Sequence, residues 1–91
     1  MMNCHSQLAQ RFWEYGRLRE CPVLDFHGHM GPFPGGYMPA CSPEEMLKIM
    51  DRCNVIMICF CSHQAMMAPA IGAAGDIAVV QKYPERFKAY H

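Results

Sequence analysis

The chain has 91 residues, with eight basic and eight acidic side chains and a formal net charge of zero. This balance argues against a nucleic-acid-binding protein, because contacts to a phosphate backbone need an excess of positive charge. The composition is 52% hydrophobic and only 18% charged, which is more apolar than a small domain with a large exposed surface normally is. We therefore expect either an adhesive surface or a domain whose remaining parts are missing.

The apolar segments and the cysteines bear on where the protein is located. The longest apolar run, residues 55–61, is much shorter than the roughly 18 to 20 residues of a membrane span. The first ten residues lack the basic patch and apolar block of a signal peptide. None of the six cysteines stands in CxxC spacing, so reduced thiols are expected: Cys4, Cys21, Cys41, Cys53, Cys59 and Cys61. Together these features predict a cytoplasmic protein that does not enter a membrane.

The N-terminal part of the chain predicts a helix followed by a strand. Residues 6–19 carry apolar side chains at helical spacing, and Ser6 is available as the N-cap. In residues 23–27, side chains of different character alternate between the two faces, as in a short strand. The glycines and prolines of residues 28–36 then predict a loop.

The middle of the chain has the strongest helix signals. Ser42, Pro43 and Glu45 form a capping box with proline at the first helical position, so a helix is expected over residues 42–53. Asn54 can end it in the left-handed conformation. The run that follows is apolar on both faces and predicts a central parallel strand, in which Cys59 and Cys61 share one face as small buried hydrophobic side chains.

The last third of the chain completes an alternating pattern. Residues 70–82 predict a helix that carries Ile71 and Ile77, although Gly72 and Gly75 weaken its first turns. A third strand is expected from Phe87 onward. Strands that alternate with helices imply an α/β fold with right-handed crossovers and a parallel sheet. Three strands are too few to complete such a sheet, so the sequence favours a truncated barrel or sheet.

Three polar side chains interrupt the first predicted strand. Strict alternation would place Asp25, His27 and His29 on one side of it and Leu24 and Phe26 on the other. Two imidazoles at the carboxyl end of a strand can bind one divalent metal ion, and a nearby carboxylate can orient a histidine or hold the loop. The alternative is that these side chains are merely solvated. Burying three polar groups without partners costs several kcal/mol, which favours metal binding.

The segment around these histidines also resembles a known family. Residues 23–31 read VLDFHGHMG and resemble the opening D-x-H-x-H segment of the amidohydrolase-related family, whose members include aminocarboxymuconate-semialdehyde decarboxylase and similar decarboxylases and hydratases. Residues 46–55 are similar to the first helix of that family and its turn into the second strand. Residues 83–87, YPERF, resemble its entry into the third strand. Phosphoesterase and deoxyribonuclease barrels open in a similar way, and this last segment favours the amidohydrolase-related family over them.

The resemblance covers residues 20–91 and implies a (β/α)8 TIM barrel. Residues 1–20 would then be a leading helix and residues 21–91 the first βα units of the barrel. It further implies a divalent metal ion, often zinc, held by His27 and His29 with ligands from later strands, and a small-molecule substrate carrying a carboxylate, amide or lactone. The reaction would be hydrolysis or decarboxylation. The general base would also come from later strands, so the catalytic residues are unknown and the isolated chain is expected to be inactive.

Other residues have weaker claims to a role. His63 follows the second predicted strand and could line the mouth of the same site, but the absence of a spacing rule favours an exposed loop histidine. The loop of residues 30–41 is equally well explained as a substrate cover or as a surface connection. His5 and His91 are assigned no role. The nine methionines are scattered and are most simply explained as filling gaps in a core.

Two other functions remain open at this stage. One is a non-catalytic module that associates with another chain, including a second copy of itself, through an open sheet edge. The other is a small carrier of Cu(I), for which thiolates and thioethers are favoured ligands.

Overall fold

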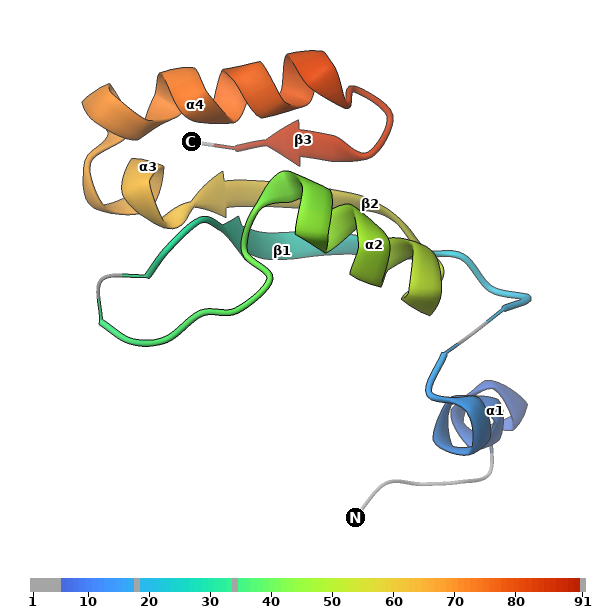
Figure 1. Ribbon diagram of the computed structural model, residues 1–91. Coiled ribbons are helices and arrows are strands. Elements are labelled where there is room, and N and C mark those ends of the chain that lie inside the picture. The colour runs from blue at the N-terminus through green and yellow to red at the C-terminus, as the bar shows by residue number, and fades with distance from the viewer. Residues whose placement is uncertain (1–5, 18, 34, 91) are drawn as a thin grey trace.

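The three strands of the chain form one parallel sheet in the order β1-β2-β3. The computed structural model describes residues 6–17, 19–33 and 35–90. Its elements follow one another as α1 (Gln7–Tyr15), β1 (Val23–Met30), α2 (Pro43–Cys53), β2 (Val55–Ser62), α3 (His63–Met67), α4 (Pro69–Lys82) and β3 (Phe87–Ala89) (Figure 1). The predicted α/β class and parallel sheet are confirmed. No helix in these described segments is long and apolar enough to cross a membrane.

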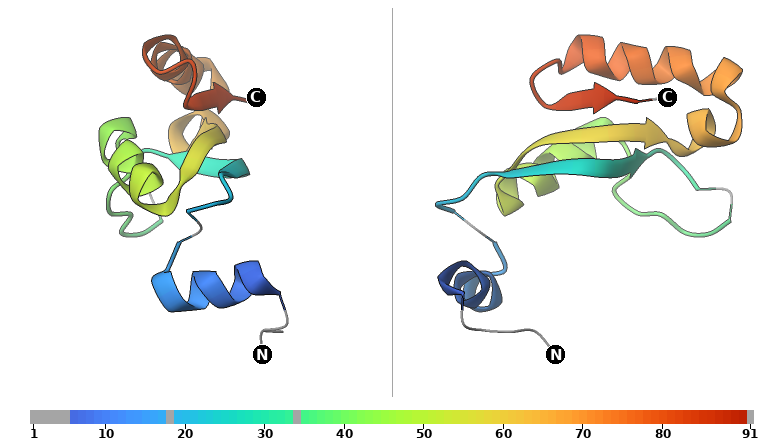
Figure 2. Two further views of the ribbon diagram at one scale, coloured as in Figure 1. Left: turned by 90° about the vertical axis from the view of Figure 1, so that its right-hand side faces the viewer. Right: turned by 180° about the vertical axis from the view of Figure 1, so that it is seen from behind.

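Helices α2 and α4, one from each connection between successive strands, lie on the same side of the sheet. In Figure 2, α2 and α4 cover one face, and no helix in the described part of the chain covers the other. This follows from the strand order, because two right-handed crossovers that advance in the same direction place their helices on one face. We call the face toward α2 and α4 the covered face and the opposite one the open face.

The core lies between the covered face and the two helices. Its buried members come from both strands and helices: Met30, Met50, Ile58, Phe60 and Phe87. The rings of Phe60 and Phe87 are fully buried and meet edge to face, with centroids 5.7 Å apart. Full burial of a side chain of this kind stabilises the fold by roughly 1.5 to 3 kcal/mol, so these two rings hold β2 and β3 to the helices.

Helix α2 begins and ends as its sequence predicts. The Ser42 hydroxyl oxygen accepts a hydrogen bond from the Glu45 backbone N–H at 3.2 Å, and the hydroxyl donates to the Glu45 carboxylate at 2.8 Å. At the other end Asn54 is left-handed, with φ of 59°. Local capping chemistry therefore sets both ends of this helix.

Helix α4 buries a different face from the one its apolar residues suggest. Ile71 and Ile77 are exposed, whereas Gly72 and Asp76 are buried. A Cβ atom on Gly72 would lie 2.3 Å from the backbone nitrogen of Ala65 in α3. Gly72 therefore permits the close approach of α3 and α4, and α3 itself was not predicted from the sequence.

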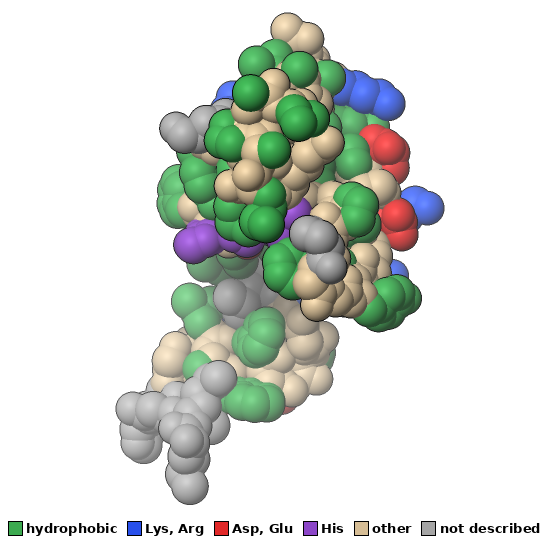
Figure 3. Space-filling model, turned by 90° about the vertical axis from the view of Figure 1, so that its left-hand side faces the viewer, with side chains coloured by type: hydrophobic (Ala, Val, Ile, Leu, Met, Phe, Trp, Pro, Cys, Tyr) green, Lys and Arg blue, Asp and Glu red, His purple; other side chains and the backbone are tan. Residues whose placement is uncertain are grey.

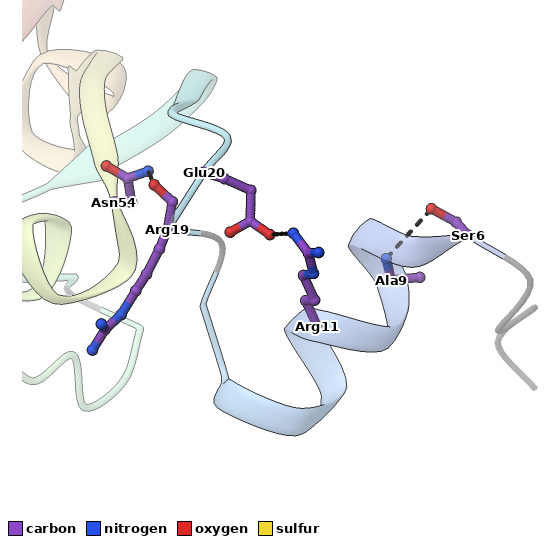
Figure 4. A network of polar contacts seen from close by, with 6 residues as sticks. All are labelled: Ser6, Ala9, Arg11, Arg19, Glu20 and Asn54. Atoms are coloured by element: carbon purple, nitrogen blue, oxygen red, sulfur yellow. Dashed lines mark hydrogen bonds and ion pairs between the residues drawn. The ribbon is translucent and has the colours of Figure 1, made fainter.

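Helix α1 lies apart from the sheet. It is shorter than predicted, because Gly16 takes a left-handed conformation with φ of 70° and ends it after Tyr15. None of its described side chains is buried. Figure 4 shows the two contacts at its junction with the sheet, an ion pair between Arg11 and Glu20 and a hydrogen bond of 3.1 Å from the Asn54 amide to the Arg19 carbonyl. Helix α1 therefore adds no buried side chain to the core.

Candidate functional site

The two histidines of the D-x-H-x-H segment lie at the carboxyl end of the sheet. Strand β1 continues three residues beyond His27, to Met30, because its end pairs with β2 through Gly28 opposite Phe60 and His29 opposite Cys61. Figure 3 views the molecule from this end and shows histidine side chains gathered among hydrophobic ones.

An irregularity in β1 changes which side chains accompany the histidines. Asp25 pairs with Ile58 and Gly28 with Phe60, so β1 advances three residues while β2 advances two. Such a bulge re-aims the side chains around it. Strict alternation was therefore wrong here, because Phe26, expected on the side opposite to the histidines, borders the same hollow as they do.

This hollow lies on the open face and combines two imidazoles with an apolar rim. Its lining residues come from β1, β2, α3 and the end of the chain: Phe26, His27, His29, Cys61, Met66 and Tyr90. The His27 and His29 rings are nearly perpendicular, with centroids 5.2 Å apart. The centroid of the Tyr90 ring lies 6.4 Å from the centroid of the His27 ring. We call this feature the histidine hollow.

Asp25 contacts the backbone of the bulge. Its carboxylate accepts a hydrogen bond of 2.9 Å from the backbone N–H of His27. Its register partner Ile58 belongs to the buried core. This contact is with the backbone of the strand, whereas the two roles expected for Asp25 were orienting a histidine and holding the loop.

The ring of His29 is fixed by a hydrogen bond to the neighbouring strand. Its Nδ1 atom lies 2.9 Å from the Cys61 carbonyl oxygen. A carbonyl only accepts, so Nδ1 carries the proton, and the Nε2 atom of the neutral ring keeps its lone pair. Metal-binding histidines in proteins are usually held in this way, with one ring nitrogen donating to a carbonyl and the other ligating.

His63 occupies a different position from the one expected. It is the first residue of α3 and only 5% exposed, so the prediction of an exposed loop histidine was wrong. Its Nδ1 atom donates to the Gly31 carbonyl at 2.8 Å, and its ring stacks on that of His29 with centroids 5.3 Å apart. The turn inward is made by Ser62, whose hydroxyl oxygen accepts from the Ala65 N–H at 3.0 Å. A serine N-cap before residues 63–67 was the signal that could have revealed this short helix.

Asp76 was not singled out from the sequence, yet it shapes the same end of the sheet. It is 3% exposed, and its carboxylate accepts a hydrogen bond of 3.0 Å from the Ser62 backbone N–H. The spacing of four between Gly72 and Asp76 on an otherwise apolar helix could have indicated their shared buried face.

Burial, and secondarily the Asp76 carboxylate, raise the pKa of the neighbouring Cys61 thiol. Cys61 is thus held as a thiol, and its proton points to the Ser62 carbonyl.

The histidine pair offers part of a metal site. Within residues 6–17, 19–33 and 35–90, no group of three or more histidine, cysteine, aspartate or glutamate side chains is arranged to hold a metal ion. Two imidazoles that share a tetrahedral ion at about 2.0 to 2.1 Å per nitrogen have ring centroids roughly 5 Å apart. The His27 and His29 rings, at 5.2 Å, fit that requirement.

No protein-family model, no curated protein and no solved structure matches this chain. These comparisons therefore add no support for the resemblance of residues 23–31 to the amidohydrolase-related family. What the histidine hollow can do has to follow from the positions of its own side chains.

Proposed function

We propose that residues 21–91 form the first two βα units and the third strand of a metal-dependent (β/α)8 barrel enzyme of the amidohydrolase type. In this proposal His27 and His29 are two of the ligands of a divalent metal ion, with zinc as the first candidate. The sequential strand order, with both crossover helices on one face, supports a barrel, since a barrel keeps all its helices outside and its strand interiors on the other side.

The observation that carries the proposal is the arrangement of the two imidazoles on the open face. They lie side by side at the carboxyl end of β1, which is the end where barrel enzymes place their active sites. The Cys61 carbonyl holds the Nδ1 proton of His29 and leaves its Nε2 lone pair available. A merely solvated histidine at position 29 would not need this hydrogen bond.

The residues of the hollow have separate tasks in this proposal. A bound divalent ion would act as a Lewis acid toward water or toward a carboxylate, amide or lactone of a small-molecule substrate. His27 and His29 hold it, and Asp25 fixes the backbone just before His27. Phe26, Met66 and Tyr90 form the rim of the hollow, against which the apolar part of a substrate could pack. The general base and the remaining ligands belong to later strands. We also propose a cytoplasmic location for the enzyme.

Zinc binding by the 91-residue chain tests the histidine pair. We expect one equivalent of Zn²⁺ to bind in an equilibrium titration against a chromophoric chelator. His27→Ala and His29→Ala should each weaken binding by about tenfold or more, because each removes one of two ligands. His5→Ala is the matched control, since it also removes one imidazole from the chain. Equal weakening by all three variants would contradict the proposed site.

The barrel is tested separately, by the coding sequence that follows the His91 codon. A reading frame that continues for about 150 to 200 residues, with histidine and aspartate codons at the ends of later predicted strands, is the result expected for a (β/α)8 barrel. A stop codon directly after His91 would contradict it.

A second candidate function is supported by the apolar side chains of the open face. Phe26 is 67% exposed, and Leu24, two residues before it in β1, is 46% exposed. Exposed apolar patches of this kind mark interaction surfaces. In this alternative the open faces of two copies cover each other, and the chain is a non-catalytic homo-oligomer. Sedimentation equilibrium distinguishes the two candidates: a dimer that Phe26→Asp converts to monomer favours association, and a monomer excludes it.

A further inference from the structure

His63 connects three parts of the molecule that meet at the histidine hollow. It follows β2 directly and begins α3. Its ring stacks on His29, at the end of β1, with an interplanar angle of 25°. On another side, the ring of Phe33, in the loop between β1 and α2, has its centroid 5.1 Å from that of the His63 ring. A residue that is 5% exposed and enclosed in this way has its ring orientation fixed by packing.

The hydrogen bond of His63 reaches the base of that loop. Its Nδ1 atom donates to the Gly31 carbonyl at 2.8 Å. Gly31 is left-handed, with φ of 83°, and its own N–H donates to the Cys41 carbonyl at 2.9 Å. This second bond joins the two ends of the loop of residues 31–41. By holding Gly31, His63 therefore holds the point at which the loop closes.

The two histidines are linked by a closed set of contacts. His29 donates to Cys61 at the end of β2, and His63, two residues later in the chain, donates back across to Gly31, two residues beyond His29. Each imidazole thus tethers the strand end of the other, and the stacked rings lie between the two tethers. Reciprocal contacts of this kind fix both rings more strongly than either bond alone.

We propose that His63 is a positioning residue, which fixes the ring of His29 by stacking and the base of the 31–41 loop by its hydrogen bond to Gly31. This proposal rests on the proposed function, in which His29 is a metal ligand. It couples the loop to the ligand, so that a change at the loop base alters the affinity for the metal. His63 itself is neither a ligand nor a catalytic group.

Two substitutions separate the stacking of the His63 ring on His29 from the hydrogen bond that His63 donates to Gly31. In His63→Asn the side-chain amide nitrogen occupies about the position of Nδ1 and still donates to Gly31, but the ring is lost. In His63→Phe the ring still stacks on His29, but the donor is lost. Gln64→Ala, at the exposed neighbouring position, is the matched control.

We expect the two variants to differ in what they change. His63→Asn should weaken zinc binding by about tenfold, as loss of the groups that orient a metal ligand does, while the Gly31 amide keeps its protection from hydrogen exchange. His63→Phe should lose that protection and weaken zinc binding less. Gln64→Ala should change neither quantity. Zinc affinity that is unchanged in both His63 variants overturns the proposal, and so does a loss of Gly31 protection in His63→Asn alone.

The native chain provides a measurement that needs no variant. Long-range ¹H–¹⁵N spectra of the imidazoles report which ring nitrogen carries the proton. We expect His29 and His63 both to be Nδ1–H tautomers before zinc is added. A rapidly averaging or Nε2–H state of His63 overturns the proposal even if its variants fail to fold. Absence of zinc binding in the native chain, with both Nδ1–H tautomers present, would instead refute the proposed function and leave the positioning of His29 intact.

Discussion

The two faces of the sheet are built from the same three strands but differ in what lies against them. The covered face buries Ile58, Phe60 and Phe87 beneath α2 and α4. The open face leaves Phe26 and other apolar side chains exposed and gathers two histidines at its carboxyl end. The contrast indicates that the covered face determines stability, and it is the basis of our proposal that the open face binds.

The largest difference between the faces should appear when the same substitution is made on each. Phe60→Ala removes a fully buried ring and should lower the free energy of unfolding by about 3 to 5 kcal/mol. Phe26→Ala removes an exposed ring and should change it by less than about 0.5 kcal/mol. Urea denaturation followed by circular dichroism measures both. Similar losses would show that the open face is also packed in solution.

The buried carboxylate of Asp76 provides the next largest effect. Asp76→Ala leaves the Ser62 N–H without its acceptor and should cost about 1 to 3 kcal/mol. Asp76→Asn keeps a side-chain oxygen that can accept this bond and should cost less. Equal losses in the two variants would indicate that the hydrogen bond to Ser62 contributes little.

Gly28, between the two histidines, tests whether the bulge is fixed by the covered face. The Cβ atom of a Gly28→Ala variant would lie 2.5 Å from Cγ2 of Ile58. Such overpacking should lower the free energy of unfolding by about 1 to 3 kcal/mol. Ile58→Ala removes the clashing methyl group, so a double-mutant cycle should show a favourable coupling between the two substitutions. Strictly additive losses would mean that Gly28 does not pack against Ile58.

The smallest expected effect concerns the reactivity of Cys61. Its raised pKa lowers the fraction of thiolate at any given pH, and the thiolate is the reactive form. At pH 8, iodoacetamide should therefore modify Cys61 more slowly than the partly exposed Cys21, and the rate at Cys61 should rise at higher pH than the rate at Cys21. In urea the two should react equally. Faster reaction of folded Cys61 would contradict its burial as a thiol.

Elements that depend on local chemistry could be predicted from the sequence. Helix α2 has its N-cap at Ser42 and its left-handed end at Asn54, and both are decided by residues within the helix and its caps. Strand β2 was recognisable because it is apolar on both faces. Apart from the short helix α3, the order of strands and helices followed from the same local signals.

Features that depend on pairing between distant segments could not be predicted in this way. The bulge near His27 arises from the register of β1 against β2, which the sequence of β1 alone does not specify. The burial of His63 depends on Gly31 and Phe33, about thirty residues away in the chain. The identification of His27 and His29 as metal ligands stays a prediction.

Imidazole ¹⁵N spectra during a zinc titration test the central claim most directly. If the account is correct, the Nε2 resonance of His29 and a ring nitrogen of His27 shift together and reach their end points at one equivalent of Zn²⁺, while the Nδ1 proton of His29 persists. If His27 and His29 shift independently, or if His5 or His91 shifts first, the two histidines of the open face do not share a metal ion.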